Sequence, residues 1–303
     1  MNYKKLITNA IIQFSIIFIA VNLFLFEKLD INKINFIFTE ETFYLLFLYV
    51  VANIYISILF CLLLQIFSEN RNYLQIVKIY LLGGLANQAI PGLGYIYRYQ
   101  KLKYDLKISI VKYGLTQSLN NIFLLLSFLL IAISLLSFEI EFLSRWIVFL
   151  IITILIMITL FLSYRNRHIL INLMKLQKVY SELIDMKKKF ILNKFKILLI
   201  FFLYFLQSFF QCYIFYKTVL LFEVDLGFIS TCYLYISSVL STFLSFTNFL
   251  GAFELVLSLT SSILSDNYTD MWSVGLGFRL IGLSSIIIII LSIYILNIKK
   301  IYR

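Results

Sequence analysis

The sequence predicts an all-α polytopic membrane protein with a single transmembrane domain over residues 1–303. Of its residues, 62% are hydrophobic and 14% are charged, whereas about 25% are charged in soluble globular domains. Seven apolar runs are close to or above the roughly 20 residues that a helix needs to cross a bilayer. They cover 6–26, 43–67, 110–136, 146–163, 197–222, 226–246 and 272–296. We expect about seven to eight spans, together with two re-entrant or broken helices.

The basic residues lie on one side of this topology. The net charge is +11, and Lys and Arg in membrane proteins concentrate in cytoplasmic loops. With the N-terminus placed in the cytoplasm, the segments on that side hold 21 of the 26 Lys and Arg residues. This orientation explains the charge without a nucleic-acid partner, and it places both termini in the cytoplasm.

Neither a metal site nor a cofactor site is predicted. Cys61, Cys212 and Cys232 lie within apolar runs and have no CxxC spacing, which favours buried thiols. The only histidine, His168, lies in a basic loop, so a site built from several His and Cys ligands is not expected. The chain also has no P-loop motif for a nucleotide.

The spans are expected to form two halves, 1–163 and 197–303, joined by a basic cytoplasmic loop at 164–196. The loop contains nine Lys or Arg residues and two acidic residues. Its apolar residues recur at steps of three and four: Ile169, Leu173, Leu176, Tyr180 and Leu183. This spacing predicts a basic amphipathic helix lying on anionic lipid. A plain connector that follows the charge rule is the alternative.

Four of the ten glycines and the only proline lie in the stretch GGLANQAIPGLGYIYRYQKLK, which begins at Gly83. An apolar segment of only 16 residues, 75–90, precedes the break, and the sequence after it is too charged to span. The residues of the break are Pro91, Gly92 and Gly94. We therefore predict a re-entrant hairpin near 75–100, buried by protein or lining a wet cavity. The pair Gly83-Gly84 by itself favours close helix packing.

The second half contains a counterpart near 247–265. Its apolar part, 249–264, is again 16 residues long, with Gly251 and Glu254 near its start. Two short or interrupted segments in corresponding places of two halves indicate a transport site within an inverted repeat.

Three ionisable residues lie in apolar surroundings: Arg98, Glu254 and Arg279. A charge at the bilayer centre costs roughly 2.5–3.5 kcal/mol, so such residues are functional candidates. Helix N-termini at the breaks would favour an anion at the same depth, and a lipid phosphate is the natural one. We expect Arg98 and Arg279 to bind it. Further hydrogen bonds would come from the amides of Asn87, Gln88, Asn120 and Asn121.

Two alternatives give these charges structural roles. Glu254 and Arg279 could neutralise each other as an ion pair. Arg98 could be an interfacial cation whose side chain extends to the headgroups.

The two breaks resemble the signatures of the lysylphosphatidylglycerol synthase transmembrane-region family, also called flippase-like. The first signature resembles Asn87, Pro91, Gly92, Gly94 and Arg98, and the second resembles Gly251, Glu254 and Arg279. The likeness covers nearly the whole chain in topology, but it is close only around the breaks. The chain departs from the usual pattern in three places. The spacing from Pro to Gly is one residue shorter, and Tyr95 stands where an acidic residue is common. Thr247-Asn248-Phe249 stands where the family has Pro-Gly-Gly.

The resemblance implies a flippase, or a partner of one, in a bacterial plasma membrane. Its substrate would be an anionic lipid or a polyprenyl-phosphate-linked glycan. Aminoacylating members carry a soluble synthase domain after the membrane part. Because this sequence ends at Arg303, seven residues after the last apolar run, we expect no lysyl transfer and no enzyme activity.

Two other functions remain open on the sequence. One is an integral-membrane glycosyltransferase that uses the acids of the first outer loop, Glu27, Asp30, Glu40 and Glu41. The other is a non-catalytic membrane subunit of surface-polysaccharide assembly, with envelope-biosynthesis enzymes as partners.

Overall fold

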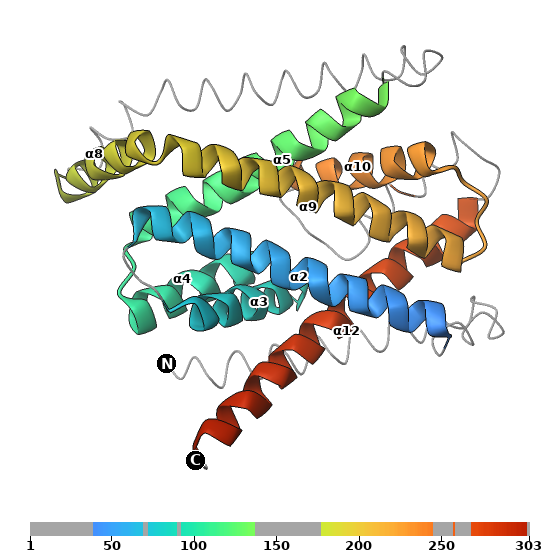
Figure 1. Ribbon diagram of the computed structural model, residues 1–303, viewed down its shortest axis with the longest axis horizontal. Coiled ribbons are helices and arrows are strands. Elements are labelled where there is room, and N and C mark those ends of the chain that lie inside the picture. Colours follow the sequence, from blue (N-terminus) through green and yellow to red (C-terminus); the bar gives the residue numbers. More distant parts are fainter. Residues whose placement is uncertain are drawn as a thin grey trace. The chain divides into compact units, whose positions relative to one another are not determined.

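The fold is all-helical in the computed structural model, which describes residues 39–68, 72–89, 92–136, 177–244, 257 and 268–301 (Figure 1). These ranges contain eight helices and no strand. The helices are α2 (Glu40–Phe67), α3 (Tyr73–Ala89), α4 (Leu93–Leu106), α5 (Ile110–Leu136), α8 (Gln177–Leu192), α9 (Lys194–Leu221), α10 (Phe228–Leu244) and α12 (Tyr268–Ile301).

Four of these helices are long and apolar enough to cross a membrane. The spans are Glu40–Phe67, Ile110–Leu135, Lys194–Leu221 and Ser273–Ile295. At about 1.5 Å per residue, each exceeds the roughly 30 Å of a bilayer's hydrocarbon core. They coincide with four of the expected spans, which supports a membrane protein. The apolar part of α10, Phe228–Leu240, is shorter.

The expected runs 6–26 and 146–163 lie outside the described residues. The count of seven to eight spans therefore stays a prediction.

The chain divides into two compact units that do not follow chain order. One unit combines residues 1–54, 78–100 and 213–303, and the other combines 55–77 and 101–212. We call them unit 1 and unit 2. The division passes through α2, α3, α4 and α9, so each of these helices contributes residues to both units.

The core of unit 2 is formed by apolar side chains from α2, α5 and α9. Its buried residues are Leu59, Leu63, Phe123, Ile197, Ile200 and Tyr204. The ring of Phe123 contacts two rings of α9 edge-on, with centroid distances of 5.3 Å to Phe201 and 5.7 Å to Tyr204. The Tyr55 hydroxyl of α2 also donates to the carbonyl of Leu203, at 3.2 Å.

An aromatic cluster forms the core of unit 1. Phe278 of α12 lies between three rings, with centroids 5.1 Å from Tyr49, 5.1 Å from Phe215 and 5.5 Å from Tyr235. On the same side of α12, the amide of Asn53 donates to the hydroxyl of Ser285, at 2.8 Å. These contacts join α2 to α12.

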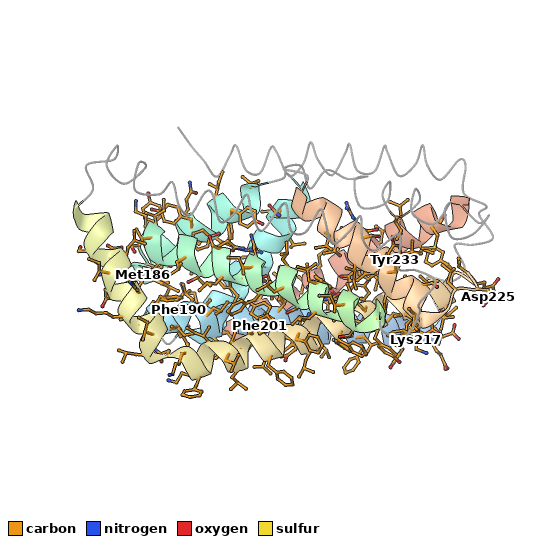
Figure 2. The ribbon with its side chains drawn as sticks, turned by 90° about the horizontal axis from the view of Figure 1, so that it is seen from above. Met186, Phe190, Phe201, Lys217, Asp225 and Tyr233 are labelled. Carbon is orange, nitrogen blue, oxygen red and sulfur yellow. The ribbon has the colours of Figure 1, made fainter. Side chains whose placement is uncertain are left out.

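The second part of the basic loop is a helix, α8, whereas residues 164–176 lie outside the described residues. Met186 is 1% exposed, and Glu182 accepts a hydrogen bond from the Ser109 hydroxyl at 2.7 Å. Through such contacts α8 packs on α5, and Figure 2 shows Met186 and Phe190 on this helix. Ile184 and Ile191 remain exposed beside several lysines. Of the five predicted apolar residues, only Leu183 has a described side chain, which is half-buried.

Candidate functional site

The candidate site is the helical hairpin of α3 and α4, which lie side by side in Figure 1. Helix α3 ends at Ala89 and α4 begins at Leu93. Gly92 between them has a φ of 82°, a left-handed conformation that glycine adopts without steric cost. Its N–H donates to Oδ1 of Asn87, at 2.9 Å. Asn87 therefore secures the turn, whereas Pro91 lies outside the described residues.

The two arms of the hairpin touch near the turn and again at their far ends. A Cβ added at Gly94 would collide with the carbonyl oxygen of Gly83 and would lie 2.7 Å from Cβ of Asn87. At the other end, the amide of Gln75 donates to the carboxylate of Asp105, at 3.4 Å. The end of α4 therefore lies beside the start of α3. The entry of this hairpin into a membrane stays a prediction.

Arg98 is buried against α3, with 8% of its surface exposed. Its aliphatic chain lies across Gly83, where an added Cβ would collide with Cγ and Nε and would lie 2.9 Å from Cδ. Its Nε–H donates to the carbonyl of Tyr80, at 3.2 Å. The guanidinium carbon is 4.0 Å from the centroid of the Tyr80 ring, a cation–π distance. The side chain therefore folds onto the neighbouring helix and does not extend to the surface.

The end of the Arg98 side chain lies beside a second glycine. Among the described residues, a Cβ at Gly84 would have two neighbours within 4 Å, Nη2 of Arg98 and Cδ1 of Ile286, each at 3.9 Å. Nη2 of Arg98 and the side chain of Ile286, on α12, therefore both lie beside Gly84. Arg279, also on α12, is half-buried. Seven residues separate it from Ile286, which corresponds to about 10 Å along the helix.

Asn120 and Asn121 belong to a different polar cluster, in unit 2. Gln117 donates to Oδ1 of Asn121 at 2.9 Å, and Asn120 donates to the same oxygen at 3.3 Å. The buried hydroxyl of Tyr204 donates to Oδ1 of Asn120, at 2.6 Å. The amides thus satisfy one another and join α5 to α9. The sequence provided no signal for Gln117 or Tyr204, because their pairing depends on how two distant helices pack.

The remaining predicted site residues cannot be placed in this geometry. Gly251 and Glu254 lie outside the described residues, as does the side chain of Gln88. The predicted ion pair of Glu254 with Arg279 therefore stays a prediction. Unit 1 holds Asn87, Gly92, Gly94, Arg98 and Arg279, whereas Asn120 and Asn121 lie in unit 2.

Tyr80 is a site residue that the sequence analysis missed. A tyrosine three positions before a Gly-Gly pair, opposite an arginine in the returning arm, is the pattern that could have revealed it.

Comparison with known proteins identified no relative of this chain. The chain matches no protein-family model, no curated protein and no solved structure.

Proposed function

We propose that the protein translocates an anionic lipid or a lipid-linked saccharide across a membrane, with Arg98 as the cation that binds the phosphate. The observation that carries this proposal is the burial of Arg98 beside a helix break. A buried charge is costly unless it is paired, and within a membrane such a residue is a functional candidate by default. We also propose that the chain belongs to the flippase-like family that its two breaks resemble.

The geometry around Arg98 suits the binding of a phosphate. The guanidinium lies over the Tyr80 ring, with its carbon 4.0 Å from the ring centroid, and a guanidinium can bind phosphate oxygens bidentately. Helix α4 begins five residues before Arg98, so its N-terminus lies about 7–8 Å away along the axis. A helix N-terminus also favours an anion.

Arg279 and Glu254 have a secondary role in this proposal. Arg279 would receive the phosphate after Arg98, and Glu254 would orient Arg279 until the substrate competes for it. The two breaks would then belong to an inverted repeat, a common arrangement around transport sites.

No described feature favours the glycosyltransferase alternative. Glu40 and Glu41 are exposed in the first turn of α2, where acidic side chains stabilise the helix dipole. The hydroxyl of Thr39 caps the same turn by accepting from the N–H of Thr42, at 3.3 Å. The positions of these two acids are thus explained by helix stability.

The proposal is tested with purified protein in liposomes that contain a fluorescent phosphatidylglycerol or a fluorescent polyprenyl phosphate. An impermeant reductant bleaches only the outer-leaflet label, so translocation increases the bleached fraction. At least one probe should cross faster than in protein-free liposomes. If neither does, translocation is wrong, and a non-catalytic subunit becomes the better explanation.

The orientation is tested by cysteine labelling in a variant without the three native cysteines. Helix α9 has 28 residues, so its ends lie about 42 Å apart. Lys188 lies before the start of α9, and the exposed Asp225 lies after its end. Both Asp225 and Lys217 of α9 are labelled in Figure 2. In intact bacteria, an impermeant thiol reagent should label Asp225→Cys and not Lys188→Cys. Labelling of Lys188→Cys alone would reverse the orientation, and labelling of both would exclude α9 as a span.

A further inference from the structure

A pocket of about 810 Å³ lies within unit 2, between the end of α2 and the start of α9. Its volume falls in the range of roughly 300–1,000 Å³ that is usual for ligand sites. Leu62 and Ile66 form the α2 wall, and Leu199 and Leu203 form the α9 wall. Each pair is four residues apart, which places its members on one face of the helix. The walls are therefore two facing apolar stripes.

A buried hydroxyl without a partner lies among the lining residues. Ser68 is 6% exposed, and its Oγ has no hydrogen-bond partner among the described residues. A buried polar group left unpaired costs roughly 1–3 kcal/mol. A ligand oxygen in the pocket would remove this penalty.

The polar part of the lining carries positive charge. Lys196 lines the pocket together with Gln65, Asn193 and Tyr73, and none of the described lining residues is acidic. Asn193 is held in place because its Nδ2 donates to the carbonyl of Lys189, at 2.8 Å. An ammonium, amides and hydroxyls together suit an anionic oxygen-rich group such as a phosphate.

The surface around the pocket suits lipid rather than water. Leu199 lines the pocket and is 60% exposed, so the apolar wall continues to the outer surface. Leu192 and Phe195, close by in sequence, are 82% and 76% exposed. Exposed apolar side chains interleaved with lysines are typical of a membrane interface.

We propose that this pocket binds one anionic glycerophospholipid. One acyl chain lies between the leucine and isoleucine stripes, and the phosphate is bound by Lys196, Asn193 and Ser68. The site lies wholly in unit 2, so it does not depend on translocation at Arg98. The bound lipid would join the end of α2 to the start of α9.

The test is photolabelling in phosphatidylcholine liposomes with a phosphatidylglycerol that carries a diazirine on one acyl chain. Label should appear in the peptides that contain Leu62 to Ser68 and Lys196 to Leu203. Unlabelled phosphatidylglycerol should compete, whereas phosphatidylcholine and inorganic phosphate should not. Competition by inorganic phosphate would indicate a simple anion site and overturn the proposal. Equal competition by phosphatidylcholine would do so as well.

Two matched pairs of variants locate the site. Lys196→Gln should weaken labelling roughly tenfold, the loss expected for one charge-assisted hydrogen bond, whereas Lys194→Gln should not. Leu199→Trp should fill the pocket and abolish labelling, whereas Leu198→Trp, at a residue that is 63% exposed and outside the lining, should not. All four positions are exposed, so the variants should fold. Equal labelling within both pairs would show ordinary surrounding lipid and refute the site.

Ser68→Ala separates ligand binding from stability. Because the hydroxyl has no described partner, its removal should leave thermal stability in lipid-free detergent unchanged or higher. The same variant should reduce the stabilisation that added phosphatidylglycerol produces. An undiminished lipid effect would exclude Ser68 from the site.

Discussion

Gly94→Ala is expected to lower the free energy of unfolding by roughly 1–3 kcal/mol, the usual cost of overpacking. The added methyl group would collide with the carbonyl oxygen of Gly83 and press on Cβ of Asn87. A backbone carbonyl cannot rotate away as a side chain can, so α3 and α4 must separate. That separation would also disturb Asn87, which accepts the hydrogen bond of the turn. Thermal unfolding followed by circular dichroism in detergent measures the change.

Two other glycines are controls for this prediction. Gly114 of α5 is exposed, and a Cβ there meets nothing within 4 Å in the part of the chain that the structure describes. Gly114→Ala should therefore stabilise the protein by about 0.5–1 kcal/mol, through helix propensity. A Cβ at Gly92 meets none of the described residues within 4 Å, but Gly92→Ala would keep the positive φ, which costs about 1–2 kcal/mol. If Gly94→Ala proves as stable as Gly114→Ala, the two arms do not touch there.

Gly83→Ala is expected to slow lipid translocation strongly, whereas Gly84→Ala is not. The methyl group at Gly83 occupies the space of the Arg98 side chain and forces the guanidinium off Tyr80. The methyl group at Gly84 makes only ordinary contacts, at 3.9 Å. Loss of one charged hydrogen bond, about 1.5–3 kcal/mol, corresponds to a roughly 10- to 150-fold slower rate. Liposome translocation and thermal unfolding are measured on both variants.

Direct replacement of Arg98 distinguishes function from packing. Arg98→Met retains the aliphatic bulk over Gly83 but removes the charge, so the fold should persist while translocation is lost. Arg98→Lys retains the charge but loses the planar guanidinium, so it should also be slow. Lys101→Ala, which removes an exposed cation from the same helix, is the control. Translocation at the wild-type rate in Arg98→Met would show that Arg98 serves only packing.

The break between α3 and α4 shows what can be predicted from local sequence. Proline and glycine disfavour a continuous helix through their own backbone properties, so Pro91, Gly92 and Gly94 together predicted an interruption without knowledge of neighbours. The structure begins α4 at Leu93, directly after the positive φ of Gly92. The partner of Asn87 is also local, since Gly92 follows five residues later.

The position of Arg98 shows where local sequence ceases to be informative. Its charge in apolar surroundings is visible in the sequence, but its contacts with Tyr80 and Gly83 lie across the turn. Those contacts depend on the rotation of α4 about its own axis. Asn120 is a second case, because its partner Tyr204 is 84 residues away and was not predicted.

By itself, the sequence determined an α-helical chain with apolar segments long enough to span a membrane and a helix break near residue 91. These properties follow from composition, from run length and from the backbone limits of proline and glycine. The tertiary structure alone decided the packing of Arg98 on Tyr80, the amide cluster around Asn120 and the pocket between α2 and α9. The physical reason is that helices such as α2 and α9 are apolar around most of their circumference. Hydrophobic periodicity then cannot identify the packed face, so shape complementarity between distant residues selects it.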